Sequence, residues 1–230
     1  MSTRKTDKKK ALAVLAELQR LYPDPHHYLN FSNPFQLLVA TILSAQCTDE
    51  KVNEVTAALF RRYRGPADFA EEAVEGLEQA VRPTGFYRNK AKAIKGAAAA
   101  IIERFGGAVP GTMEELLTLP GIARKSANAI LQNGFGKIEG VVVDTHVIRV
   151  AGRLGWTANT DPGKIEEDLM RLFDKKEWRW LPYYLKSHGR AVCRAPVPKC
   201  AECTVNPLCP SAFIDSPTTE RRTSRRARGA

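Results

Sequence analysis

The sequence predicts an all-α fold built from two helical domains. Apolar residues recur with the helical period through most of the 230-residue chain. Pairs such as Gly65-Pro66 and Gly106-Gly107 separate the periodic segments, as turn residues do between helices. Only one short stretch, EGVVVDT at 139–145, has the composition of a β-strand. These three observations favour a helical bundle over a mixed fold.

The individual helices follow in order. Leu12, Leu15 and Leu18 mark a first helix that ends near Tyr22. The segment 33–46 is almost uniformly apolar and reads as a buried central helix, with Asn33 as N-cap and Pro34 as its first residue. Further helices are predicted over 49–63, 89–105, 112–136 with an internal turn, 144–155, 161–173 and 178–192.

These helices suggest a domain division. Residues 28–137 would form one helical bundle, and 8–27 would join 138–211 in a second domain. The segments 1–7 and 212–230 would be basic, disordered tails. No internal repeat is visible.

The charge of the chain is concentrated at its ends. The formal net charge is +10, and residues 1–10 and 220–230 each contribute +4. Such tails are either simply solvated or attract an anionic polymer such as nucleic acid. No apolar run approaches the roughly 18–20 residues of a membrane span, and the N-terminus lacks the apolar region of a secretory signal. We expect an intracellular protein with no membrane partner.

The segment LPGIARKSAN, residues 119–128, places a Pro-Gly turn between two short apolar helical stretches. This pattern predicts a helix–hairpin–helix, whose exposed N–H groups at the start of the second helix could accept a phosphate oxygen. An ordinary helix connection with Gly121 in the turn is the alternative. Lys125 lies in the first helical turn, where the dipole disfavours a cation by only about 0.3–1 kcal/mol, and it could simply bind a phosphate.

Asp144 follows the apolar run in VVVDTHVIRV, residues 141–150. Aspartate is a preferred N-cap, and this position directly precedes a predicted helix. Capping alone would explain the residue.

Four of the five cysteines lie within 193–209, as Cys193, Cys200, Cys203 and Cys209. The spacing C-x6-C-x2-C-x5-C contains one close pair, whereas zinc sites usually combine two. Four thiolates in one loop, with Pro210 after the last, favour a [4Fe–4S] cluster over zinc. Cys47 stands apart and is expected to be a small buried residue.

Taken together, LPGIARKSAN, VDTHVIRV and the cysteine spacing resemble the helix–hairpin–helix DNA glycosylases, most closely the endonuclease III family. The resemblance covers roughly residues 8–211. It implies a DNA N-glycosylase and DNA-(apurinic or apyrimidinic site) lyase of base excision repair that removes oxidised pyrimidines. Lys125 would be the nucleophile at C1′, Asp144 the catalytic carboxylate, and the four cysteines the ligands of a structural [4Fe–4S] cluster.

The resemblance also implies DNA contacts. Gln46 and Phe86 would fill the gap left by an extruded nucleotide, although a polar helix end and a core aromatic are the plain readings of these two residues. The full set of expected DNA-binding residues is Gln46, Phe86, Gly121, Ile122, Ala123, Ser126, His146, Arg194 and Lys199. The expected partner is double-stranded damaged DNA, bound by a monomer in the bacterial cytoplasm at the nucleoid.

One departure and two alternatives qualify this interpretation. The family usually has a second glycine where this chain has Ala123, and alanine would restrict both backbone torsion and close approach to phosphate. An adenine-mismatch glycosylase shares the hairpin, aspartate and cluster, but lacks the lysine and has a further C-terminal domain. A non-catalytic iron–sulfur DNA-binding protein on the same scaffold is the other alternative.

Overall fold

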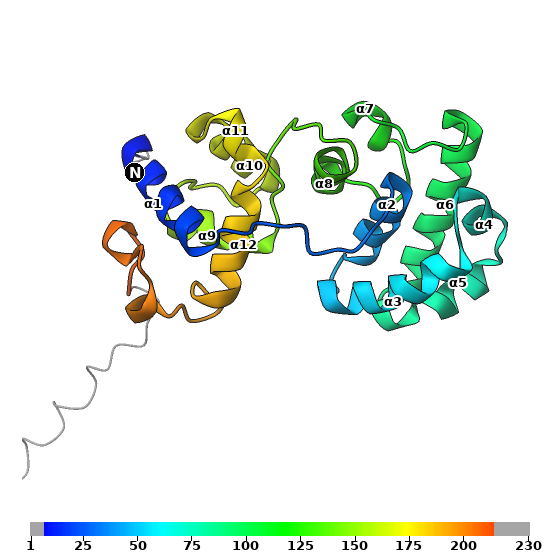
Figure 1. Cartoon of the computed structure of the whole chain (residues 1–230), viewed down its shortest axis with the longest axis horizontal. Helices are drawn as coiled ribbons and strands as arrows, with labels where there is room; N and C mark the ends of the chain where they lie inside the picture. Colours follow the sequence, from blue (N-terminus) through cyan, green and yellow to red (C-terminus); the bar gives the residue numbers. More distant parts are fainter. Residues whose placement is uncertain (1–6, 214–230) are drawn as a thin grey trace, which may run out of the picture. The chain divides into compact units, whose positions relative to one another are not determined.

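The computed structural model of the chain describes residues 7–213. Within that range the chain forms twelve α-helices and three short 3₁₀ helices, without a β-strand (Figure 1). The all-α prediction is confirmed. Residues 139–145 are not a strand, because they have no second extended segment with which to exchange backbone hydrogen bonds. Instead, Val141 and Val143 simply bury their side chains.

The described residues divide into two compact units. The middle unit contains His26–Val142 together with Lys175–Trp180. The terminal unit contains the described residues up to Pro25, Val143–Asp174 and the described residues from Leu181 onward. Apart from Asp7, Ala212 and Phe213, the predicted basic tails lie outside the described residues.

The helix α2 (Pro34–Leu43) is the centre of the middle unit. Asn33 caps it by accepting a hydrogen bond from the backbone N–H of Gln36 at 2.9 Å, and Pro34 occupies the first turn, as predicted. The side chains of Leu37, Leu38 and Leu43 are completely buried. The helix ends at Leu43, and the three residues to Gln46 form turns rather than the last helical turn of the predicted segment.

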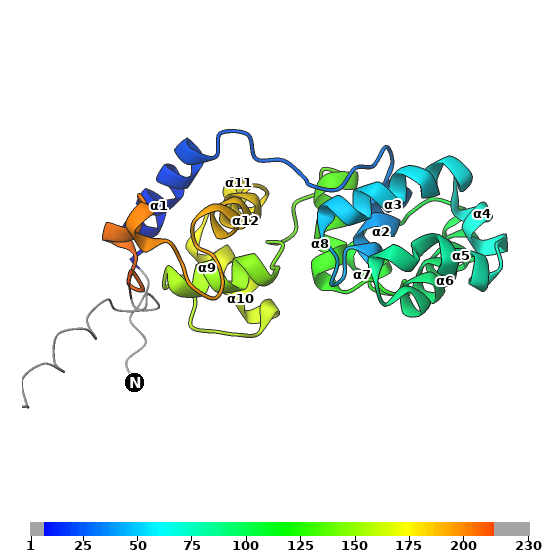
Figure 2. The same cartoon turned by 90° about the horizontal axis from the view of Figure 1, so that it is seen from below.

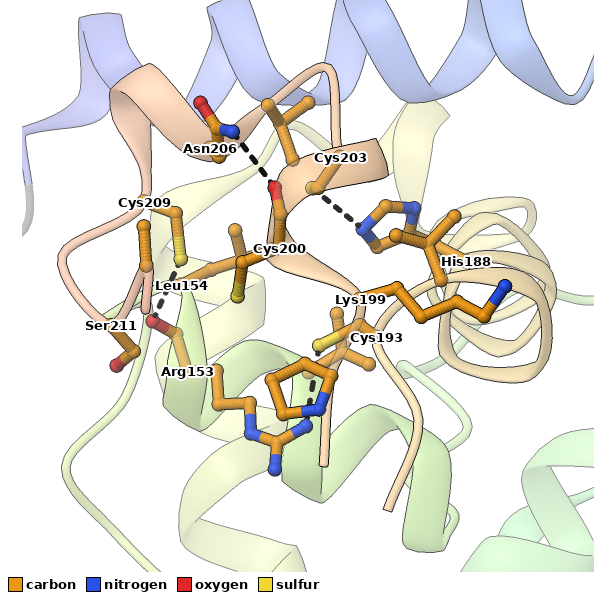
Figure 3. A pocket seen from close by; sticks show the side chains of 15 residues that line it. Arg153, Leu154, His188, Cys193, Lys199, Cys200, Cys203, Asn206, Cys209 and Ser211 are labelled. Atoms are coloured by element: carbon orange, nitrogen blue, oxygen red, sulfur yellow. Dashed lines mark hydrogen bonds between the residues drawn. The ribbon is translucent and has the colours of Figure 1, made fainter. Parts of the chain in front are cut away.

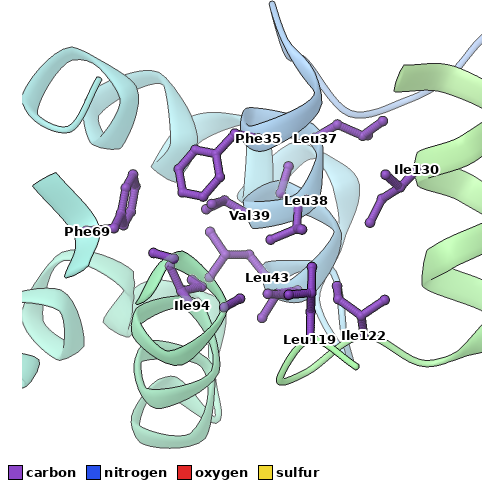
Figure 4. Close-up of a cluster of buried hydrophobic side chains, with 14 of the residues drawn as sticks. Phe35, Leu37, Leu38, Val39, Leu43, Phe69, Ile94, Leu119, Ile122 and Ile130 are labelled. Atoms are coloured by element: carbon purple, nitrogen blue, oxygen red, sulfur yellow. The ribbon is translucent and has the colours of Figure 1, made fainter. Parts of the chain in front are cut away.

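The middle unit also contains α3 (Asp49–Arg62), α4 (Pro66–Glu71), α5 (Val74–Val81), α6 (Tyr87–Phe105), α7 (Met113–Leu116), α8 (Arg124–Gly134) and α11 (Lys175–Trp178), with the 3₁₀ turn η1 (Arg82–Thr84) before α6. Of these helices, α3, α6 and α8 pack against α2. Figure 4 shows Ile94 from α6 and Ile130 from α8 turned toward the side chains of α2. Helices α4 and α5 were not predicted, because six and eight residues are too few to establish a periodicity.

The terminal unit is assembled from distant parts of the sequence. It contains α1 (Lys8–Leu21), α9 (Thr145–Arg153), α10 (Pro162–Leu172) and α12 (Leu181–Ala191), followed by η2 (Cys200–Glu202) and η3 (Asn206–Leu208) (Figure 2). Helix α12 packs against both α9 and α1. Asp7 caps α1, and that helix buries Val14, Leu15 and Leu18.

The predicted helix 178–192 is in fact two elements. Pro182 has no backbone N–H to donate to the carbonyl of Trp178 four residues earlier, but it fits the first turn of a new helix. The chain therefore ends α11 at Trp178 and begins α12 at Leu181.

A half-buried carboxylate joins α10 to the preceding loop. The carboxylate of Asp168 accepts hydrogen bonds from Thr157 Oγ1 at 2.6 Å, Asn159 Nδ2 at 2.7 Å and Arg171 at 2.5 Å. Burial acts to raise the pKa of Asp168, but these hydrogen bonds outweigh it and hold the pKa below its usual value.

None of the helices within residues 7–213 is both long enough and apolar enough to cross a bilayer.

Candidate functional site

The predicted helix–hairpin–helix is formed by α7, a tight turn and α8. Leu119 and Ile122 are buried on either side of the turn, and the Ile122 N–H donates to the Leu119 carbonyl at 3.2 Å. Gly121 has φ of +79°, and a Cβ there would lie 2.8 Å from the Cβ of Ala93. Both the torsion and the close approach require glycine at this position.

Lys125 occupies the second residue of α8 and is exposed to solvent, whereas Ser126 beside it is half-buried. The preceding N-cap is Ala123, which supplies no side-chain acceptor for the N–H groups of the first turn. A helix that begins in this way directs its N–H groups and positive dipole end toward an outside anion. Lys125 thus lies in the first turn of α8, where the backbone N–H groups and the helix dipole favour an anion.

The backbone at Ala123 does not need glycine. Its φ of −104° and ψ of 170° are extended torsions that any residue adopts. The expectation that alanine restricts the torsion of the hairpin here is therefore wrong.

Asp144 begins α9 in the terminal unit and is half-buried. Its Oδ1 accepts a hydrogen bond from the Val147 N–H at 2.8 Å, which confirms the N-cap prediction. His146 lies two residues further on, and burial lowers the pKa of its imidazole while the negative charge of Asp144 partly opposes that effect. The Nδ1 of His146 lies 3.2 Å from the guanidinium of Arg149.

Gln46 and Phe86 share an unusual backbone. Both are exposed, Phe86 by 63% of its surface, so the core-aromatic reading of Phe86 is wrong. Both also adopt left-handed torsions, with φ of 51° and 49°. Such torsions cost a non-glycine residue about 1–3 kcal/mol and persist only where the surrounding structure imposes them.

The four clustered cysteines line one cavity of the terminal unit (Figure 3). All four are free thiols, and Cys200 is buried. Burial raises the pKa of Cys203 and of Cys209, and electrostatic interaction with the neighbouring cysteines raises each further. Thiols that repel one another as anions are stabilised by a shared cation.

Within residues 7–213, no three His, Cys, Asp or Glu side chains are arranged to hold a single metal ion. Two side chains also reach the sulfur atoms: Arg153 donates to Cys193 Sγ at 3.6 Å, and His188 Nε2 lies 3.6 Å from Cys203 Sγ.

The loop that begins at Cys193 is braced by α9. Arg149 Nε donates to the Cys193 carbonyl at 3.1 Å, and Arg153 donates to the carbonyls of Arg194 and Pro196 at 2.7 and 3.0 Å. The two cations predicted to contact DNA are exposed. Arg194 Nε donates to two carbonyls at the end of α12, and Lys199 pairs with Glu202 at 3.0 Å.

Sequence reasoning missed Lys90 and the bracing arginines. The Lys90 side chain is only 4% exposed, and its Nζ donates to the carbonyls of Leu43 and Thr84. Helical periodicity could have predicted the burial of Lys90, because this residue falls on the same face of the helix as the buried Ile94 and Ile101.

Comparison with known proteins agrees with this geometry. Residues 39–175 match the model of the HhH-GPD superfamily base excision DNA repair proteins. Endonuclease III of Synechocystis is 52% identical over 205 residues, which cover 89% of this chain and 94% of that protein. Two solved structures, a non-covalent endonuclease III–DNA complex and a trapped endonuclease III–DNA covalent intermediate, superpose with TM-scores of 0.88 at 39% identity. Each covers 91% of this chain, and 98% and 99% of the solved chains are matched.

The chain therefore belongs to the HhH-GPD superfamily of base excision DNA repair proteins. Within that superfamily it is similar to endonuclease III over nearly the whole length of those enzymes, as the sequence motifs predicted.

Proposed function

We propose that this chain carries out its reaction in base excision repair through Lys125 and Asp144. The class of activity, a bifunctional DNA glycosylase and abasic-site lyase, follows from the family and from the covalent intermediate of a similar enzyme. The residue roles are the proposal. The observation that supports them best is the exposed Lys125 at the start of α8, directly after a hairpin suited to bind phosphate.

In the proposed reaction the unprotonated amine of Lys125 attacks C1′ of the damaged nucleotide. A C–N bond to the enzyme forms while the N-glycosidic bond breaks, and its electron pair leaves with the base, which takes up a proton. The sugar ring opens to a Schiff base. Loss of a C2′ proton then breaks the C3′–O bond by β-elimination, and water releases the sugar from the lysine.

The amine must lose its proton first. A free lysine has a pKa near 10.4, so deprotonation at pH 7 costs about 4–5 kcal/mol. The helix terminus supplies only about 0.3–1 kcal/mol. Burial of a lysine lowers its pKa by as much as 3–5 units, and because Lys125 is exposed in the protein alone, DNA must supply that burial.

Asp144 would stabilise positive charge on the sugar as the base departs. One carboxylate oxygen already accepts the Val147 N–H, which fixes the side chain without using its full capacity as an acceptor. The same carboxylate would favour transfer of the proton from the lysine.

Base extrusion is assigned to Gln46 and Phe86. Chemistry at C1′ requires the nucleotide outside the stack. An exposed amide and an exposed aromatic ring, each on a constrained turn, suit insertion into the gap that is left.

Cys193, Cys200, Cys203 and Cys209 would hold a [4Fe–4S] cluster. When bound, the cluster would offset part of the charge of the four thiolates and fix the loop that presents Arg194 and Lys199. The residues of the chain carry out the glycosylase and lyase steps without it. We expect the protein to act on double-stranded damaged DNA as a monomer, at the nucleoid in the bacterial cytoplasm.

Borohydride trapping tests the proposal. The wild-type protein and a Lys51→Gln control, which alters an ordinary surface ion pair, should give a covalent adduct with a thymine glycol duplex. Lys125→Gln should give none. An adduct that persists in Lys125→Gln would refute the assignment. A duplex panel with thymine glycol, an abasic site, 8-oxoguanine opposite C, and adenine opposite G or 8-oxoguanine would separate this function from mismatch-specific adenine removal.

A further inference from the structure

Lys90 is a buried cation in the apolar core of the middle unit. Its ammonium donates to the carbonyl of Leu43 at 2.8 Å and to the carbonyl of Thr84 at 2.7 Å. Its backbone N–H donates to the carbonyl of Phe86 at 3.2 Å. Burial of a charged group is unfavourable unless hydrogen bonds compensate it, and here the ammonium makes two such bonds, one to each of two separate segments.

Both segments lead directly into the two left-handed residues. Leu43 is the last residue of α2, and Gln46 follows three positions later. Thr84 ends η1, and Phe86 follows two positions later as the N-cap of α6. Burial lowers the pKa of Lys90, and the charge of Cys47, which is adjacent to Gln46, opposes that effect. The ammonium therefore lies close to the chain on both sides of this junction.

We propose that Lys90 is a positioning residue for base extrusion. By binding both carbonyls it would fix the spacing of Gln46 and Phe86, so that the two side chains enter the duplex together. This inference rests on the proposed role of these two residues in filling the gap. Lys90 itself, being buried, does not touch DNA.

The chain contains a matched control on the same helix. Lys95 of α6 also donates from Nζ to two backbone carbonyls, those of Ala70 and Glu72 at the end of α4. Lys90→Met and Lys95→Met each remove an ammonium that bridges two carbonyls. Only Lys90→Met affects the segments that lead to Gln46 and Phe86.

The experiment compares two substrates that differ in the need for extrusion. Strand cleavage is measured on an abasic site in duplex DNA and on an abasic site in single-stranded DNA, where no base pair must be opened. Lys90→Met should lower the duplex rate at least tenfold more than the single-strand rate. Lys95→Met should leave the ratio of the two rates within twofold of wild type, even if both variants melt at a lower temperature.

Hydrogen–deuterium exchange supplies an independent readout. In Lys90→Met, exchange should accelerate selectively at residues 44–47 and 84–87, whereas a general loss of stability accelerates it throughout the middle unit. If Lys90→Met does not fold, Lys90→Gln carries the same comparison.

An unchanged rate ratio in Lys90→Met, or an equal change in both lysine variants, would overturn the positioning role. If Gln46→Ala and Phe86→Ala themselves leave the ratio of duplex to single-strand rates unchanged, the proposed extrusion role on which the inference rests fails instead. The two failures are therefore distinguishable.

Discussion

Asp144 offers a direct way to separate a structural role from a catalytic one. Its Oδ1 accepts the Val147 N–H at 2.8 Å, and the amide oxygen of asparagine can accept the same bond. Asp144→Asn should therefore leave stability nearly unchanged. Asp144→Ala removes the cap and should cost about 1 kcal/mol, which lowers Tm by about 2–4 °C for a protein of this size.

The effect of the two substitutions on activity should differ from their effect on stability. Both variants lose the carboxylate charge, so both should excise a damaged base at least about 100-fold more slowly than wild type. Single-turnover excision from a thymine glycol duplex, measured beside thermal melting, gives both quantities. The pKa of His146 should also fall in Asp144→Asn, because the charge that opposes the effect of burial is gone, and NMR titration can follow it.

The reasoning fails if Asp144→Asn keeps full excision activity. It also fails if this variant loses as much stability as Asp144→Ala, because the carboxylate would then do more for folding than cap α9.

Three further predictions concern other parts of the molecule. Gly121→Ala should destabilise the protein by about 2–4 kcal/mol, because alanine is strained in the left-handed torsion and its Cβ would collide with Ala93. The variant should also bind lesion-free duplex more weakly, and an unchanged melting temperature would contradict this prediction. Asp168→Asn should lower Tm at pH 7. Because the folded pKa of Asp168 is depressed, the difference from wild type should begin to shrink below about pH 4, where the unfolded carboxyl takes up its proton, and should vanish only when the folded carboxylate is protonated as well; a difference independent of pH would exclude the ionised network. Cys200→Ser should yield protein without the brown colour of an iron–sulfur cluster and with weaker DNA affinity, whereas purified wild type that contains stoichiometric zinc instead would refute the cluster assignment.

The sequence was sufficient wherever a local rule governs the structure. The start of α2 at Pro34 and the cap of α9 at Asp144 were read correctly, because N-caps depend on residues within one turn. The buried character of α2 was equally visible, because an almost uniformly apolar segment can only be accommodated inside.

Features that depend on distant residues were not predictable. Gln46 and Phe86 are not glycines, so the sequence gives no sign of their left-handed torsions. The segments before these two residues are held by hydrogen bonds from Lys90 on α6, which comes near only when the chain folds. The break before α12 was missed although its signal is local: Pro182 cannot donate a hydrogen bond to the carbonyl of Trp178, and this interrupts the helix that was predicted over 178–192.

The packing of α1 against α12 has a consequence for biosynthesis. Helix α1 is made first, yet α12 is translated about 160 residues later, which at ordinary elongation rates means a delay of about 8–30 s. During that interval the apolar stripe of Val14, Leu15 and Leu18 has no native partner on α12, while nearly the whole of the middle unit is already outside the ribosome. The packing of α1 against α12 is therefore completed only after α12 has been translated, and until then these three apolar side chains lack that native contact.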